Sequence, residues 1–479
     1  MKVALLLCPS WDAQFPTYAL AALSAQLRRR GHEPAVFDLN LAVKRLDALG
    51  PAAAKVPASA ESPHADLMED STEPYEDYFA AVADRVVSEG HRVAAFQLFL
   101  TNVGASARLA RMIKERDPGV TVVFGGSECL TFERCRHYAG LDGVDAVLYG
   151  EADASFPRLV DEVAREGRPR RGRGVLLRGD EAGWKDEQEP VEDLDALPFA
   201  DYGGHRLGAY RGKSLHTCRG CVRRCVFCSE WRVRAFRRMS PERVHAEVLH
   251  QLDRDPGVRT FLFADSLVNG DLRGLEAFCD RVTADGLRID WNGYAIVRPD
   301  MTRACCDKLA RSGCGELFFG IESGSDKVLA AVAKGTTAAW NARALEDARA
   351  AGIRTAAGWL VGFPTETESD FQDSLAFMAA HGRHISRLDP NLFTIEELGA
   401  DWDRYGLTPT RQATYWRTRD GRNTFPVRVD RFRRLVKTAL EQGVQVYWEG
   451  LAPERFDARL DAMLEKYERG EARGAWAAA

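Results

Sequence analysis

The chain has 479 residues, and its 65 lysines and arginines against 70 aspartates and glutamates give a net charge of −5 at neutral pH. A chain of this length accommodates more than one domain, and a near-neutral charge provides no overall basic field for nucleic acid. No apolar run approaches the roughly 18 residues that a membrane-spanning helix needs. We therefore expect a multidomain protein with neither a membrane span nor a nucleic-acid partner.

The first 165 residues alternate short apolar runs with helical patterns, which is typical of a parallel α/β sheet. Leucines recur at helical spacing between the first two runs, and Gly31 follows them where a helix would end. We therefore predict a doubly wound, Rossmann-like domain over residues 1–165. The runs that predict its strands are 2–8, 34–38, 93–100, 120–124 and 144–149.

Glycines and polar residues follow the last two of these runs. Ligands of doubly wound sheets bind at the carboxyl ends of the strands, near the point where the strand order reverses. A glycine at such an end lets the backbone approach a large ligand, because no side chain intervenes. The candidate ligand contacts in this domain are Gly125, Gly126, Ser127, Gly150 and Glu151.

Two further segments interrupt or follow this domain. Residues 48–74 are rich in Ala, Pro, Ser and Glu, which predicts either a mobile loop or a cap over a cofactor cleft. Residues 167–173 are basic and punctuated by glycine, as expected of an exposed connection. We assign residues 166–207 to a linker.

Cys221, Cys225 and Cys228 lie in one short run, at a spacing that can hold an iron–sulfur cluster through three thiolates. Electron carriers use four protein ligands, so three ligands leave one iron open to an external ligand. The alternatives are structural zinc and a ferredoxin-type site that includes Cys218. Zinc knuckles normally stand a dozen or more residues apart, and the chain has no second ferredoxin-type run. We expect a 4Fe-4S cluster on the three cysteines, with Cys218 beside it.

The chain has 11 cysteines, and those outside this run show no second metal-binding spacing. We expect them to be buried free thiols. Reduced thiols and an oxygen-labile cluster suit the cytoplasm. Seven arginines between Arg219 and Arg238 could receive an acidic electron donor or an anionic substrate, although a solvated charged face explains most of them equally well.

The run from Cys221 to Cys228, with Phe227 in its aromatic position, resembles the signature of the radical S-adenosylmethionine (SAM) superfamily. The resemblance implies that SAM chelates the open iron. One electron, from a donor such as flavodoxin or ferredoxin, would then release a 5'-deoxyadenosyl radical, while the protein contributes positioning and shielding. The resemblance further implies a partial six-stranded β/α barrel.

Residues 208–393 fit such a barrel, because a strand-like run is followed by a helical pattern six times. The runs begin near Lys213, Arg259, Arg288, Glu316, Arg354 and Ile385. Functional residues of β/α barrels collect at the carboxyl ends of the strands. Asp265, which follows the second run, could be such a functional residue or could instead be a helix cap. The SAM contacts that the resemblance implies are Phe227, Asp265, Ser266, Glu322, Ser323, Lys334 and Gly362.

The pairs Gly125-Gly126 and Gly150-Glu151, each after a strand, also look like the cobalamin-binding domain that precedes the barrel in a large radical SAM subfamily. No histidine of this domain stands in an Asp-x-His-x-x-Gly motif, so the sequence supplies no lower axial ligand. The alternative is an α/β domain that packs on the barrel without binding cobalamin.

Residues 394–479 are predicted to be mainly helical, with an apolar stripe from Phe456 to Tyr467 that is typical of a packed helix. Aromatic residues before the stripe could close the open side of the barrel against water, or could be ordinary packing residues. They are Trp402, Tyr405, Tyr415 and Trp416.

These resemblances together imply a cobalamin-dependent radical SAM enzyme and favour a methyltransferase that acts on an unactivated carbon of a small natural product or a peptide. The alternative is a radical cyclase, rearrangement or oxidative enzyme that uses cobalamin without methyl transfer. A methylthiotransferase is less favoured because it needs a second cluster, and Cys8, Cys129 and Cys135 are widely separated in the sequence.

Overall fold

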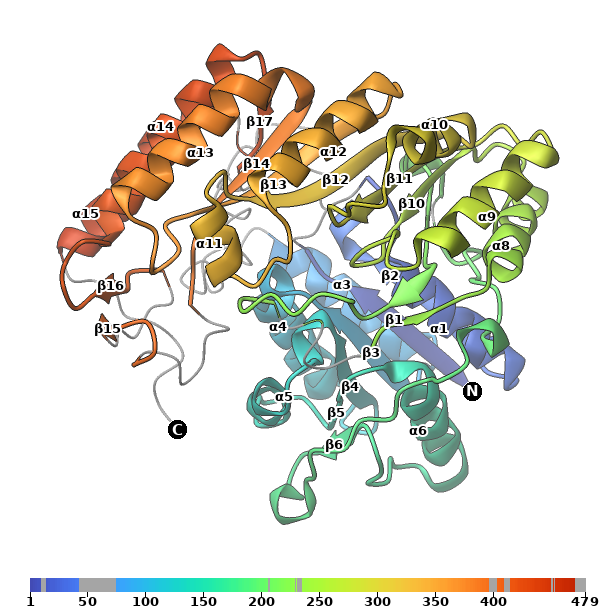
Figure 1. Cartoon of the computed structure of the whole chain (residues 1–479). Helices are drawn as coiled ribbons and strands as arrows, with labels where there is room; N and C mark the ends of the chain where they lie inside the picture. Colours follow the sequence, from blue (N-terminus) through green and yellow to red (C-terminus); the bar gives the residue numbers. More distant parts are fainter. Residues whose placement is uncertain are drawn as a thin grey trace. The chain divides into compact units, whose positions relative to one another are not determined.

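The structure is a computed structural model, and its chain forms two compact units (Figure 1). The units are Met1–Leu215 with Glu247–Val258, and His216–Ala246 with Arg259–Ala479. The described residues include no helix that is long and apolar enough to cross a membrane. The insertion at 48–74 and Trp402 lie outside the described residues. The described residues are 1–9, 14–42, 75–205, 207–228, 230, 235–395, 403–408, 414–448, 451 and 453–469.

The first unit contains a sheet with the strand order β2-β1-β3-β4-β5-β6. Neighbouring strands are parallel except for the antiparallel pair β5 and β6. The strand order reverses between β1 and β3, because β2 lies on one side of β1 and all later strands lie on the other. The strands are β1 (Lys2–Leu7), β2 (Glu33–Asp38), β3 (Val93–Leu98), β4 (Thr121–Gly126), β5 (Ala146–Leu148) and β6 (Val175–Leu177).

Helices cover both faces of this sheet, as the predicted doubly wound fold requires. Side chains of α1 and α6 are buried against one face, whereas side chains of α3, α4 and α5 are buried against the other. The predicted fold class is therefore confirmed, and β6 adds a strand from the segment that was assigned to the linker. The helices are α1 (Tyr18–Arg29), α3 (Glu76–Ser88), α4 (Val103–Arg116), α5 (Phe132–Ala139) and α6 (Ala152–Glu166).

The second unit is built on a sheet whose strands are hydrogen-bonded in the order β17-β14-β13-β12-β11-β10. All these neighbours are parallel. Each strand begins within two residues of its predicted start, except β17, which was not predicted. The predicted first strand is present as β7 (Lys213–Leu215) and leads directly into the cysteine loop. The strands are β10 (Thr260–Phe263), β11 (Asp290–Ala295), β12 (Cys314–Glu322), β13 (Arg354–Val361), β14 (Arg387–Leu392) and β17 (Gln445–Val446).

A row of helices follows the strands of the second unit, each packed against the next from α9 to α10, α12, α13, α14 and α15 (Figure 1). This alternation of strand and helix is the partial β/α barrel that the sequence predicts. The helices are α9 (Leu272–Ala284), α10 (Arg303–Arg311), α11 (Asp326–Ala331), α12 (Ala338–Ala350), α13 (Glu368–His381), α14 (Phe425–Glu441) and α15 (Phe456–Glu468), and α8 (Pro241–Arg254) has residues in both units.

The predicted apolar stripe near the C-terminus packs as a core. Phe456, Leu460 and Met463 of α15 are buried, and the Tyr467 ring lies 5.5 Å from the ring of Phe425. Trp416 is fully buried, and its indole N–H donates to the Phe393 carbonyl at 3.0 Å. Trp416 is therefore a packing residue of the second unit.

Candidate active site

Asp265, at the end of β10, holds the first residues of the cysteine loop. Its carboxylate accepts hydrogen bonds from the backbone N–H groups of Thr217 (2.8 Å) and Cys218 (3.0 Å) and from the Thr217 hydroxyl (2.7 Å). Burial raises the pKa of Asp265 to about 7, although these donors favour its charged form. Both carboxylate oxygens are thus engaged by the loop, while the neighbouring Ser266 is exposed.

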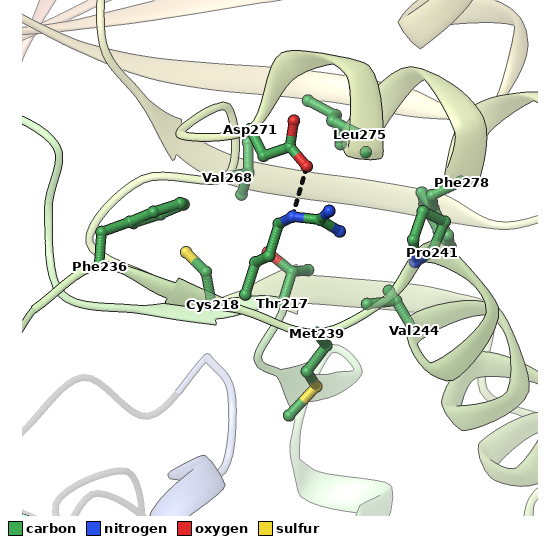
Figure 2. A pocket seen from close by; sticks show the side chains of 12 residues that line it. Thr217, Cys218, Phe236, Met239, Pro241, Val244, Val268, Asp271, Leu275 and Phe278 are labelled. Carbon is green, nitrogen blue, oxygen red and sulfur yellow. Dashed lines mark ion pairs between the residues drawn. The ribbon is translucent and has the colours of Figure 1, made fainter. Parts of the chain in front are cut away.

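The Cys218 side chain has a hydrogen-bond partner of its own. Its thiol donates to the Leu267 carbonyl at 3.0 Å, and burial raises its pKa well above the ordinary value. The side chain lines a small pocket with a cavity volume of about 30 Å³. Figure 2 shows Cys218 among the mostly apolar side chains of this pocket. Arg238 also lines the pocket and pairs with Asp271 at 2.7 Å.

Four of the predicted site residues gather where β12 ends. The Lys334 ammonium lies 2.6 Å from the Glu322 carboxylate, and each side chain is only 10% exposed. The same ammonium lies 6.0 Å from the centre of the Phe227 ring. Burial alone would lower the pKa of Lys334, but Glu322 and then the Cys225 thiol outweigh it and raise the pKa. One buried cation therefore pairs with the Glu322 carboxylate and would offset the charge of a Cys225 thiolate.

The cysteine loop is also tied to the barrel by hydrogen bonds to two backbone carbonyls. The Val226 N–H donates to the Val332 carbonyl at 3.1 Å, and the Arg223 guanidinium donates to the Val297 carbonyl at 3.2 Å. Among the described residues, no three His, Cys, Asp or Glu side chains already form a group that could hold a metal ion. A cluster would therefore draw the three thiols together. Their chemistry fits it, since thiolates are the usual cluster ligands and Lys334 offsets their charge.

The segment from Glu322 to Ser325 rests on helix α13. The Ser323 hydroxyl lies 3.1 Å from the Ser374 hydroxyl, which also accepts from the Gly324 N–H at 3.1 Å. The Ser325 hydroxyl donates to a carboxylate of α13 at 3.2 Å. Glu322 has a φ of 64°, in the left-handed region, which costs a non-glycine residue about 1–3 kcal/mol. These hydrogen bonds hold the strained turn that aims Glu322 at Lys334.

Gly324→Ala should loosen this turn. An added Cβ would lie 2.7 Å from the Phe377 Cβ and 2.8 Å from the Ser374 Cα, both of α13. Overpacking of this kind costs about 1–3 kcal/mol, so the midpoint of urea unfolding should fall. Gly208→Ala is the control, because nothing lies within 4 Å of a Cβ at that position. Equal midpoints for the two variants would contradict the close packing.

Gly362 follows β13 and has a φ of +84°, which favours glycine. Its N–H donates to the Glu366 carboxylate at 3.0 Å, and its carbonyl accepts from the Asn423 side-chain amide at 3.3 Å. Burial raises the pKa of Glu366 to about 7, even though Arg431 lies beside it. Gly362 is therefore placed by contacts separate from those that join Lys334 and Glu322.

In the first unit, the predicted contact residues follow β4 and β5. Gly126 has a φ of +116°, and the Ser127 hydroxyl donates to the Leu98 carbonyl at 3.3 Å. The Gly150 N–H donates to the Cys129 carbonyl at 2.8 Å. The Glu151 carboxylate, which is buried, accepts from the backbone N–H of Val191 at 3.0 Å. Thus Glu151 has a partner in the segment after β6, which sequence reasoning did not anticipate.

The carboxyl edge of this sheet has features that fit a polar ligand. The side-chain amide oxygen (Oε1) of Gln97 in β3 and the Thr17 hydroxyl before α1 are buried without hydrogen-bond partners. Both lie toward the carboxyl ends of β1 and β3, where the strand order reverses. His32 and His91 precede β2 and β3 and so stand at the opposite, amino edge. The edge could therefore hold a polar ligand such as a corrinoid, and neither of these two histidines stands at it.

Gly126→Ala should destabilise the protein more than an alanine that only has to adopt a positive φ. An added Cβ would lie 2.7 Å from the Leu98 carbonyl oxygen and 2.9 Å from the Leu98 nitrogen. Gly179→Ala is the matched control, because its φ is +78° with nothing within 4 Å. We expect Gly126→Ala to lower the midpoint of urea unfolding further than the control. A drop no larger than that of Gly179→Ala would show that β3 does not approach Gly126 so closely.

Comparison with sequence families and curated proteins finds similarity over part of the chain. Residues 215–378 match the family model described as the Radical SAM superfamily. An uncharacterized methyltransferase of Pyrococcus horikoshii is 27% identical over 285 residues, 56% of this chain and 60% of the relative. The hopanoid C-3 methylase of Methylococcus capsulatus is 29% identical over 281 residues, 55% of this chain and 52% of the relative.

A further relative has a different activity. The anaerobic magnesium-protoporphyrin IX monomethyl ester cyclase of a Synechocystis species is 24% identical over 292 residues, 56% of this chain and 55% of the relative. The chain thus spans a little over half the length of the curated relatives it matches.

Solved structures resemble more of the chain. The radical SAM methyltransferase TsrM from Kitasatospora setae, with cobalamin and a 4Fe-4S cluster bound, has a TM-score of 0.66 at 17% identity and covers 95% of this chain and 89% of its own. The cobalamin-dependent SAM radical enzyme OxsB has a TM-score of 0.61 at 17% identity and covers 80% of this chain and 52% of its own. At these identities the likeness concerns the fold.

Proposed function

We propose that this chain, whose residues 215–378 match the Radical SAM superfamily model, is a cobalamin-dependent radical SAM enzyme that transfers a methyl group to a carbon of a small-molecule or peptide substrate. The observation that carries the proposal is the gathering of Cys225, Phe227, Glu322 and Lys334 at the end of β12. The relatives that include methyltransferases support the reaction type. The fold shared with TsrM over 95% of the chain supports the cofactor pair.

In this proposal the three thiolates of the loop hold the 4Fe-4S cluster, and the ends of β12 and β13 receive SAM through Glu322, Ser323 and Gly362. When bound, the cluster supplies the electron that cleaves SAM, and cobalamin supplies the methyl group. Lys334 offsets the charge of Glu322 and of the loop thiolates inside a buried site. Asp265 braces the start of the loop through its hydrogen bonds to Thr217 and Cys218.

Cobalamin in this proposal binds at the carboxyl edge of the first sheet. Its contacts are Gly125, Gly126, Ser127, Gly150 and Glu151, beside the unpartnered polar atoms of Gln97 and Thr17. The reductant is a flavodoxin or ferredoxin, which would meet the arginine-rich segment that begins at Arg219. A reducing cytoplasm suits both the cluster and the free thiols.

The proposal is tested by anaerobic turnover of the reconstituted protein with SAM, a reductant and hydroxocobalamin. Corrinoid absorbance that stays with the protein through gel filtration, together with both S-adenosylhomocysteine and 5'-deoxyadenosine, is the expected result. The two products report the two uses of SAM, as methyl donor and as radical source. Formation of 5'-deoxyadenosine without S-adenosylhomocysteine would contradict methyl transfer.

Formation of 5'-deoxyadenosine alone would favour a radical cyclase, the alternative that the magnesium-protoporphyrin relative supports. A methylthiotransferase needs a second cluster in the first unit. Cys8, Cys129 and Cys135 are fully buried there, and the Cys135 thiol donates to the Cys129 carbonyl at 3.4 Å. These three cysteines do not lie in one short run of the kind that holds a cluster, so the sequence does not favour this reaction.

A further inference from the structure

Helix α14 lies beyond the residues that match the radical SAM family, yet it carries two buried arginines that reach the turn after β13. Arg428 is 0% exposed and Arg431 is 3% exposed. Long charged side chains on a helix normally face water, because burying a cation without a partner is costly. Their burial therefore indicates that this helix has a specific task at that turn.

Arg431 acts through a carboxylate. Its guanidinium lies 3.1 Å from the carboxylate of Glu366, and the two side chains are 3% and 1% exposed. Glu366 in turn accepts the N–H of Gly362 at 3.0 Å. Arg431 also donates to the backbone carbonyl of Glu366 at 3.2 Å. One side of the Gly362 backbone is thus tied to α14 through a buried ion pair.

Asn423, which lies two residues before α14, ties the other side. Its side-chain amide donates to the carbonyls of Gly362 (3.3 Å) and Phe363 (3.0 Å). The amide oxygen accepts from the Arg428 guanidinium at 3.3 Å. Both backbone polar groups of Gly362 are therefore satisfied by, or through, residues of the α14 region.

Arg428 itself fills the space beside Gly362. An added Cβ on Gly362 would lie 2.3 Å from the Arg428 Cγ and Cδ, so the arginine stem and the glycine fit one another. The guanidinium stacks on Trp416 at 3.8 Å from the ring centre and donates to the Thr414 and Trp416 carbonyls at 2.7 and 2.9 Å. These acceptors and the Asn423 amide oxygen are all uncharged, and the Arg428 Nε has no hydrogen-bond partner.

We infer that Asn423, Arg428 and Arg431 form a clamp that positions the Gly362 turn for SAM, so that SAM affinity depends on a helix outside the family domain. The inference rests on the proposed function, which places SAM at this turn. The three are positioning residues, because they act through Gly362 and Glu366. A rigid turn lowers the ordering cost of binding, which is how such support raises affinity.

Calorimetric titration of SAM into the reconstituted, cluster-loaded full chain under anaerobic conditions tests the clamp. Arg428→Met keeps the stem beside Gly362 and removes the guanidinium. We expect it to weaken SAM binding about tenfold, or about 1.4 kcal/mol, with iron content unchanged. Arg433→Met is the matched control on the same helix, because Arg433 pairs with Asp457 and Asp461 instead. It should bind SAM as the unaltered protein does.

Asn423→Ser keeps the inference testable if Arg428→Met does not fold, because it removes only the amide that reaches Gly362. Asn423→Ser should also weaken SAM binding. Arg428→Lys should bind SAM more tightly than Arg428→Met does, although less tightly than the unaltered protein. Wild-type affinity in folded Arg428→Met or Asn423→Ser would overturn the clamp alone. Failure of the unaltered, cluster-loaded protein to bind SAM would overturn the proposed function and the clamp with it.

Discussion

Cys225→Ala is expected to abolish both cluster binding and SAM cleavage. Cys225 is buried, and Lys334 lowers its pKa against the larger effect of burial, which raises it. Only two thiolates would remain in the loop, and two ligands cannot keep the cluster of a three-thiolate site in place. Iron and acid-labile sulfide should fall to background in the anaerobically reconstituted variant, and no 5'-deoxyadenosine should form. Cys221→Ala and Cys228→Ala should behave in the same way.

Cys218→Ala is the matched control, because this cysteine belongs to the same run. Its thiol donates a hydrogen bond to the Leu267 carbonyl, and its side chain lines the pocket beside β10. The variant should keep its full complement of iron and still cleave SAM. Loss of the cluster in Cys218→Ala would instead indicate a fourth protein ligand, as in an electron carrier, and would contradict the site described above.

Lys334→Met should be the most damaging change outside the cysteines. It leaves the Glu322 carboxylate 10% exposed and without its cation, and removing one partner of a buried ion pair costs about 3–5 kcal/mol. We expect urea unfolding to report a loss of about 3 kcal/mol. SAM cleavage should fall by roughly a hundredfold, the cost that is typical of removing one preorganised charged or hydrogen-bonding group from an active site.

Lys308→Met is the control for this prediction. Lys308 pairs with Glu276 and Asp280 at the surface, where its side chain is 28% exposed, and surface ion pairs contribute about 0–1 kcal/mol. A combined Lys334→Met and Glu322→Gln variant should regain stability, because no unpaired charge stays buried, but not SAM cleavage. If Lys334→Met unfolded within about 0.5 kcal/mol of the unaltered protein, the ion pair would not stabilise the site.

The regular parts of both units could be predicted from the sequence because buried parallel strands are short, continuous apolar runs. The run before Cys8 and the run before Glu322 show this pattern, and both strands were observed. Strands β6 and β17 were missed, since three and two residues respectively are too few to show a period. Such strands form because a neighbouring strand offers free backbone groups, which the local sequence does not reveal.

The candidate site could be predicted only in part, because motifs name residues but do not reveal their contacts. Glu322 and Lys334 were named separately from motifs, and only the fold shows that they form an ion pair. The sequence predicts that Asp265 contacts SAM, but in the structure both of its carboxylate oxygens accept hydrogen bonds from the cysteine loop. Its assignment as a SAM contact stays a prediction.

The support from α14 could not be predicted at all. Arg428 and Arg431 stand on a helix with many arginines, a pattern that usually indicates a solvated face. Their burial depends on the distant partners Gly362 and Glu366, which the sequence separates from them by more than sixty residues. The signal that could have drawn attention to them is their spacing of three, which places both on one face of the helix.

The central claim is that three thiolates hold a cluster with one iron open to SAM. The most direct test is the electron paramagnetic resonance spectrum of the reduced, reconstituted protein, recorded during a titration with SAM. The account predicts that the spectrum of the cluster changes shape and saturates as SAM binds to the open iron. A spectrum that stays the same at saturating SAM would contradict it.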